Sequence, residues 1–247
     1  MNSKIESGVH LFSRIKQKMY LEGINPLLFP EDSLQQNSVI EITGSDANEK
    51  YKLLMDFMIR CILPPSYNKE FRDCGVIFIN VDHQIQLMDL IKIMNMHLKK
   101  LNIKSKSQII ENALKNLTIV NCFNLEEFQL AIQNIERIVN SNENQSLVLI
   151  DNISPYYWSQ RFFVNNLSLY SWSLKNFEML YDVVKSLNIA VIFIRNETTE
   201  NKKQLCKFVD LRIIVQREGE YCKALVLNYV KQSEICVSYK SENILIF

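Results

Sequence analysis

The feature that most constrains this chain is a set of five short apolar runs separated by segments with apolar residues at helical spacing. Strands that are apolar along their whole length fit burial on both faces, which is typical of a parallel sheet between two helical layers. The sequence therefore predicts five β-α units. The predicted strands are residues 39–43, 75–80, 117–123, 146–151 and 189–194, and the predicted helices are residues 48–62, 84–99, 125–140 and 168–187.

The pattern changes after residue 194. "LRIIVQRE", "YCKALVLNY", "EICVSYK" and "NILIF" alternate in polarity, as antiparallel strands with one solvated face do. Gly219 and Glu220 separate the first two and suit a hairpin turn. The predicted fold class is α/β, with a mainly parallel sheet flanked by helices and a C-terminal antiparallel extension.

Residues 1–38 precede the first predicted core strand. A short helix through Leu11, Phe12 and Ile15 is expected, followed by "INPLLF", an apolar anchor bracketed by Pro26 and Pro30. This anchor is expected to lie against the main domain. We therefore divide the chain into an N-terminal lead segment, residues 1–38, and a core domain, residues 39–247.

Composition excludes several classes of protein. The 247 residues carry a formal net charge of +1, which argues against a chain that binds DNA over its whole surface. Long apolar stretches that could span a membrane and an N-terminal secretion signal are both absent. The six cysteines form no C-x-x-C pair and lie mostly in apolar segments, so reduced core thiols of an intracellular protein are favoured over disulfides or zinc ligands.

The stretch "EITGSDANEKYKLL" has the outline of a phosphate-binding loop, G-x-x-x-x-G-K-[ST], between a strand and a helix. Gly44 occupies the first position and Lys50 that of the lysine. Glu49 replaces the second glycine, and Tyr51 replaces the Ser or Thr whose hydroxyl would hold Mg²⁺. An alternative for Lys50 is a solvated lysine in the first helical turn.

These substitutions bear directly on the chemistry. The Tyr51 hydroxyl lies too far from its backbone to meet the metal, and the Glu49 and Asp46 carboxylates would repel a triphosphate. Because an anion at a helix N-terminus is itself stabilising, the hypothesis is that Glu49 fills the niche of the phosphate. Replacing Glu49 with Gly and Tyr51 with Thr is then expected to restore ATP binding.

Two further carboxylates complete the candidate pocket. Asp151 ends the apolar strand "SLVLID", where an acid would steer Mg²⁺ through water. Asp82 follows "GVIFIN" at the position of a water-activating carboxylate. The alternative for Asp82 is a helix N-cap for a segment beginning at His83.

At this point the chain resembles the RecA-type recombinases and their paralogues. The resemblance rests on "ESGVHLFSRI", "INPLLF", the loop leading into "MDFMIRCILP", "GVIFINVD" and above all "LVLIDNISPYYW", and it covers residues 5–197. It implies a RecA-like phosphate-loop core, nuclear location and a role in homologous-recombination repair of DNA breaks. It also implies a hetero-oligomer with other paralogue subunits.

The chain departs from the family pattern in its catalytic positions. Family members that hydrolyse ATP keep the second glycine and the Ser or Thr, which are Glu49 and Tyr51 here. The family acid that activates water is Glu, whereas Asp82 is one carbon shorter. The family sensor glutamine corresponds to Glu197, or to Asn196 if the alignment shifts by one residue.

Two segments are candidates for DNA contact. The loop "NISPYYWSQRFFVNN" combines aromatic residues with Arg161, a combination that suits stacking on exposed bases. The segment after the fifth strand carries Lys202, Lys203 and Lys207. The alternatives are that Tyr156, Tyr157 and Trp158 pack in the core or a partner interface, and that the lysines are solvated.

Three functions follow from these observations. The first is a recombinase-paralogue subunit with little or no nucleotide turnover, with no cofactor assigned, for which Leu27, Leu28 and Phe29 are a candidate docking face. The second is a DNA-dependent ATPase with an atypical loop, for which ATP and Mg²⁺ would be cofactors. The third is a small-molecule kinase, whose lid would have to lie around Arg212 and Arg217.

Overall fold

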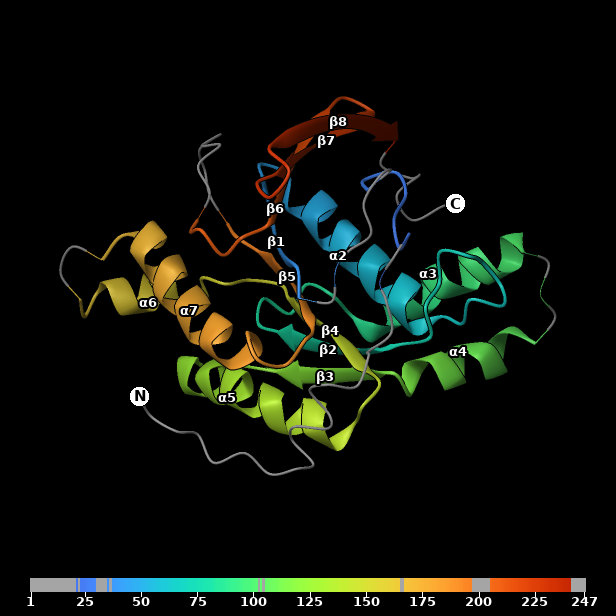
Figure 1. The fold of residues 1–247 in the computed structure, drawn as a ribbon, viewed down its shortest axis with the longest axis horizontal. Coiled ribbons are helices and arrows are strands. Elements are labelled where there is room, and N and C mark those ends of the chain that lie inside the picture. Colours follow the sequence, from blue (N-terminus) through green and yellow to red (C-terminus); the bar gives the residue numbers. More distant parts are fainter. Residues whose placement is uncertain are drawn as a thin grey trace.

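The computed structural model describes residues 21, 23–29, 35, 37–101, 103, 105–164, 167–196 and 205–240. One eight-stranded sheet runs through the described part of the chain, in the order β3-β2-β4-β5-β1-β6-β7-β8 (Figure 1). The predicted fold class is confirmed. The strands are β1 (Val39–Gly44), β2 (Gly75–Asn80), β3 (Leu117–Asn121), β4 (Gln145–Ile150), β5 (Ala190–Ile194), β6 (Leu211–Glu218), β7 (Tyr221–Asn228) and β8 (Ser233–Lys240).

The antiparallel extension begins one strand later than the sequence predicts. β6 pairs with β1 in parallel, from Ile40↔Leu211 to Gly44↔Val215, so it belongs to the parallel sheet. β7 and β8 are the antiparallel strands. The turn from β6 to β7 lies at the predicted Gly219, whose φ of +66° favours glycine. The polar residues of β6 made its sequence resemble a strand with one solvated face. In the structure its first five residues are buried, and only the last three leave the core.

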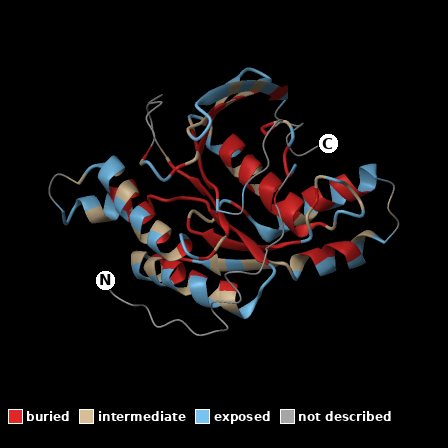
Figure 2. Ribbon diagram, in the orientation of Figure 1, coloured by how far each residue is buried: buried red, intermediate tan, exposed pale blue. Residues whose placement is uncertain are grey.

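Helices cover both faces of this sheet. α2 (Ala47–Ile62), α3 (Leu87–Lys100) and α4 (Lys106–Leu114) pack in one apolar cluster, and α5 (Leu125–Ser141) and α7 (Leu169–Val184) pack in the other. Strand residues alternate between the two clusters. Figure 2 shows the buried central strands between partly exposed helices. The sequence predicted α2, α5 and α7 closely, but it missed α4 and the five-residue α6 (Tyr157–Arg161).

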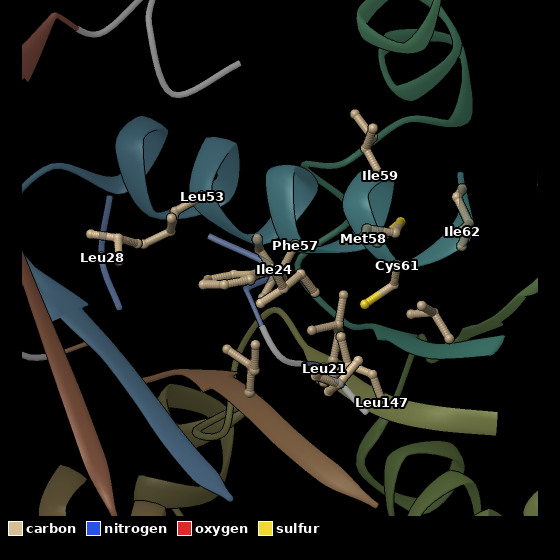
Figure 3. Close-up of a cluster of buried hydrophobic side chains, with 14 of the residues drawn as sticks. Leu21, Ile24, Leu28, Leu53, Phe57, Met58, Ile59, Cys61, Ile62 and Leu147 are labelled. Atoms are coloured by element: carbon tan, nitrogen blue, oxygen red, sulfur yellow. The ribbon is translucent and has the colours of Figure 1, made fainter. Parts of the chain in front are cut away.

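The described part of the lead segment packs in the same apolar cluster as α2, as expected of the "INPLLF" anchor. Leu21, Ile24, Leu28 and Phe29 are all buried, and Figure 3 shows Ile24 and Leu28 in the same cluster as side chains of α2. Leu28 and Phe29 therefore cannot form the docking face that the sequence suggested. The lead sequence was apolar because it completes the core of its own domain.

A buried polar cluster ties the same segment to α2. The Asn25 side chain donates a hydrogen bond of 2.9 Å to Asp56, and Arg60 Nε donates one of 2.7 Å to the same carboxylate oxygen. Arg60 also pairs with Glu70. Burial raises the pKa of Asp56 to about 6, although Arg60 and Asn25 oppose that shift. Arg60 of the distinctive "RCILP" stretch thus holds the Asp56 carboxylate to which Asn25 of the lead segment bonds.

The six cysteines are free thiols, as predicted, and four of them are buried. No helix among the described residues is long and apolar enough to cross a membrane.

Candidate functional site

The candidate pocket lies at the carboxyl ends of β1, β2, β4 and β5, where open α/β sheets bind ligands. Its first residue, Gly44, ends β1 with a φ of +136°. A Cβ atom added there would lie 1.9 Å from the Val215 carbonyl oxygen of β6. Packing between β1 and β6 therefore requires a glycine at this position, whether or not a phosphate binds.

Asp46 occupies the N-terminus of α2. Its side chain is the N-cap and accepts a 3.0 Å hydrogen bond from the Glu49 backbone nitrogen. The buried Glu49 carboxylate turns away, pairs with Lys52 Nζ at 2.7 Å and lies beside the Cys222 thiol of β7. Burial, assisted by Glu49, raises the pKa of Cys222 to about 11. Asp46 rather than Glu49 therefore caps the N-terminus of α2, which counts against the hypothesis that Glu49 fills the phosphate niche.

Lys50 is a buried member of the pocket. Lys50 is 3% exposed, and its Nζ donates a 2.8 Å hydrogen bond to the Asn196 side-chain oxygen just after β5. Burial lowers the pKa of Lys50, while the nearby Asp82 and Asp46 oppose that shift. The alternative of a solvated lysine is therefore wrong. Of the two candidates for the sensor position, Asn196 contacts Lys50, and Glu197 lies outside the described residues.

Tyr51 and Asp82 interact directly. The Tyr51 hydroxyl donates a 2.9 Å hydrogen bond to Asp82 Oδ2, and Asn152 Nδ2 donates one of 2.9 Å to Oδ1. Burial and the Asp82 carboxylate together raise the pKa of Tyr51 well above its usual range. Asp82 is not a helix N-cap, since α3 begins at Leu87 with Gln86 as its cap. The predicted helix start at residue 84 was three residues too early.

Asp151 is fully buried behind this pair. Its two carboxylate oxygens accept hydrogen bonds from the Val81 and Asp82 backbone nitrogens, at 2.8 and 3.0 Å. Burial raises the pKa of Asp151 to about 7, with a further contribution from the Asp82 charge, although both hydrogen bonds oppose the shift. Asp151 therefore supports the loop that carries Asp82.

These contacts do not fit a bound Mg²⁺-triphosphate. Mg²⁺ prefers oxygen ligands in octahedral geometry, but the Tyr51 hydroxyl is committed to Asp82 and both Asp151 oxygens accept backbone hydrogen bonds. Lys50, which would contact the outer phosphates, bonds to Asn196 instead. Among the described residues, no group of three or more His, Cys, Asp or Glu side chains could hold a metal ion. The pocket satisfies its polar groups from within the chain.

Comparison with known proteins agrees with this architecture. No protein-family model matches the chain. The DNA repair protein XRCC2 of Mus musculus is 26% identical over 159 residues, which are 64% of this chain and 55% of the mouse protein, so the match spans about half of that relative. The crystal structure of the RadB recombinase matches with a TM-score of 0.59 and 16% identity, over 87% of this chain and 91% of that one. This chain has the fold of a RecA-type recombinase. The expected resemblance to recombinase paralogues is confirmed.

The short helix α6, in the segment that follows β4, presents one aromatic side chain to solvent. Tyr157 is buried and its hydroxyl donates to the Leu167 carbonyl at 3.0 Å, so it packs in the core as one alternative proposed. Trp158 is 69% exposed, and the Arg161 guanidinium lies 5.6 Å from its ring centroid. Phe162 and Phe163 follow and are even more exposed. Their doublet in "SQRFFV" was visible in the sequence, but whether it faced solvent was not.

The second candidate for DNA contact is described only at its base. Lys202 and Lys203 lie outside the described residues. The base is tied to α7, because the Tyr170 hydroxyl donates a 2.9 Å hydrogen bond to the Leu205 carbonyl. Phe208 stacks on Tyr181 with ring centroids 4.2 Å apart, and Lys207 Nζ lies 5.1 Å from the Phe208 ring.

The arginine pair considered as a kinase lid does not form one. Arg212 is 1% exposed and lies 3.4 Å from Glu41 in the middle of β1, and Arg195 pairs with the same carboxylate. Arg217 lies outside this cluster, 3.9 Å from Asp46. Arg212 is therefore a core residue of the RecA-type sheet. The signal that sequence reasoning missed was Glu41 itself, a charge in an otherwise apolar strand.

Proposed function

We propose that this chain is a RecA-fold subunit of homologous-recombination repair that works without turning over ATP. It acts in the nucleus, in a hetero-oligomer with other recombinase-paralogue subunits. Its similarity to a protein named for DNA repair supports the proposed role in repair. Its recombinase fold supports the proposed assembly with other subunits of that fold. We further propose that residues 1–38 act as a built-in part of the 39–247 core, which the burial of Leu21 and Ile24 supports.

One observation carries the proposal that the subunit is not an ATPase. The Tyr51 hydroxyl is bonded to Asp82, so the two side chains that replace the metal ligand and the water-activating acid engage each other. A hydrogen bond to an ionised carboxylate stabilises the folded state by about 1.5–3 kcal/mol when buried. Nucleotide binding would have to break this contact and the Lys50–Asn196 bond together.

We propose that α6 contacts single-stranded DNA within the complex. Trp158 is exposed, and Arg161 lies over its ring, so the two could stack successive bases while the guanidinium approaches a phosphate. Replacing both residues with alanine is expected to weaken binding of the assembled complex to single-stranded DNA by about tenfold or more, since each stacked base contributes about 1–3 kcal/mol. Lys202 and Lys203 are proposed to act on the same strand.

The test of function is complementation of cells that lack the gene, scored by survival after treatment that breaks DNA. Lys50→Met keeps the aliphatic stem of the lysine but removes the ammonium group that a phosphate would need. If the subunit works without ATP, Lys50→Met should restore survival as well as the wild type does, provided that both proteins accumulate equally. Loss of survival with normal accumulation and normal complex formation would refute the proposal.

A second candidate function is a DNA-dependent ATPase with an atypical loop. The observation that favours it is the burial of Lys50 in the pocket, within the electrostatic influence of Asp82 and Asp46. This candidate predicts that the assembled complex hydrolyses ATP when single-stranded DNA is added and that Lys50→Met abolishes the hydrolysis contributed by this subunit.

A further inference from the structure

The outward face of α3 combines exposed methionines with lysines. Five residues of the helix are buried against the core, and on the opposite side Met88 is 62% exposed and Met96 46% exposed. Lys92 and Lys99 lie on this same side, because positions three, four and seven apart share a helix face. Apolar anchors interleaved with charge are typical of surfaces that bind another helix.

This face is positively charged. α3 contains three lysines and one aspartate, a net charge of +2, and His97 adds none because burial lowers its pKa to about 4. By the same count no other described helix exceeds +1. Lys99 and Lys100 in the last turn also interact favourably with the helix dipole, but Lys92 lies two turns earlier and, within the described part of the chain, pairs with the exposed Asp89. The charge therefore extends along the face.

The chemistry of the face favours a protein over a nucleic acid. Aromatic residues that could stack on bases are absent from α3, and its exposed apolar residues are methionine and leucine. Methionine adapts its shape to a partner side chain and is frequent at protein-binding surfaces. Lysines beside such anchors attract carboxylates, so the matching partner element is an amphipathic helix with acidic residues along one edge.

We propose that the outward face of α3 docks an acidic amphipathic helix of a partner recombinase subunit. This proposal rests on the hetero-oligomer of the proposed function and names the surface that holds it. A subunit of this fold can supply such a helix: α5 of this chain carries three glutamates and one arginine, a net charge of −2, with Leu130 exposed. α3 and α5 belong to the two opposite helical layers, so the contact would join unlike faces of neighbouring subunits.

The test uses full-length protein and each recombinase-paralogue subunit of the same organism, purified singly, with binding measured by biolayer interferometry. The variant is Lys92→Glu with Lys99→Glu. The matched control is Lys175→Glu on α7 with Lys185→Glu at the C-cap of that helix, where Lys185 pairs with Asp182 at the same spacing as Lys92 with Asp89. All four lysines are exposed, so both variants should fold, which circular dichroism checks.

We expect the α3 variant to weaken binding of one subunit by about tenfold or more, with the control within about twofold of the wild type. Wild-type affinity should also fall as salt rises, and that dependence should be smaller for the α3 variant. Equal affinity for wild type and both variants would overturn this docking site and leave the proposed function standing. Failure of the wild type to bind any subunit would overturn the proposed function itself. A homodimer that the α3 variant dissociates would overturn the choice of partner.

Discussion

Removing the Tyr51 hydroxyl should destabilise the protein, because the hydroxyl bonds to a carboxylate inside the pocket. Tyr51→Phe leaves the ring in place and deletes a single 2.9 Å hydrogen bond to Asp82. Hydrogen bonds to charged groups contribute about 1.5–3 kcal/mol when buried, and Tyr51 is only partly buried, so we expect a loss of about 1–2 kcal/mol. Asp82 keeps its second hydrogen bond, from Asn152, which limits the loss.

The assay is urea unfolding at neutral pH, followed by circular dichroism. Tyr67→Phe is the matched control, because Tyr67 also packs partly buried against the core and its hydroxyl has no hydrogen-bond partner among the described residues. We expect the control to change the free energy of unfolding by less than about 0.5 kcal/mol. The m-value should be the same for all three proteins. Equal stability of Tyr51→Phe and the control would refute the proposed Tyr51–Asp82 pairing.

Three further changes test other parts of the structure. Gly44→Ala should lower the free energy of unfolding by about 2–6 kcal/mol, because its φ is positive and the new Cβ would clash with Val215; denaturant melts check this. Asn25→Ala should lower it by about 2–4 kcal/mol through loss of the hydrogen bond to Asp56, and limited proteolysis should cut the lead segment sooner. Burial raises the pKa of Asp151 to about 7, whereas the unfolded state releases this proton near pH 4. Between about pH 4 and pH 7 this group therefore lowers the free energy of unfolding as pH rises. Asp151→Asn should remove that part of the pH dependence in urea melts from pH 5 to 8, and an unchanged slope would contradict it.

The fold was largely predictable because the parallel strands are buried on both faces. β1 and β2 are continuous apolar runs whose bounds the sequence placed within one residue, since burial and hydrophobicity coincide there. α4 was missed because only Ile109, Ile110 and Ala113 of its nine residues are buried, too few for a clear period. The start of α3 was misplaced because a loop precedes it, in which His83 adopts a positive φ that no local pattern announces.

The sequence identified the residues of the candidate site, but it did not identify the hydrogen bonds between them. Lys50, Tyr51, Asp82 and Asp151 were all identified from motif spacing, and the structure brings them to one edge of the sheet. Which of them bond to one another depends on contacts between residues 31 to 146 positions apart. Glu49 illustrates the limit: its position in the motif suggested a role at the phosphate niche, but tertiary packing against β7 directs its carboxylate elsewhere.

The most direct test of the account is isothermal titration of the purified protein with ATP and Mg²⁺, alongside Tyr51→Thr and the double variant Tyr51→Thr with Lys50→Met. We predict no saturable binding by the wild type up to about 1 mM nucleotide, which corresponds to less than about 4 kcal/mol of binding free energy. Tyr51→Thr should gain Mg²⁺-dependent binding because it frees Asp82, and the double variant should lose it again. Stoichiometric, Mg²⁺-dependent ATP binding by the wild type in the micromolar range would contradict the account.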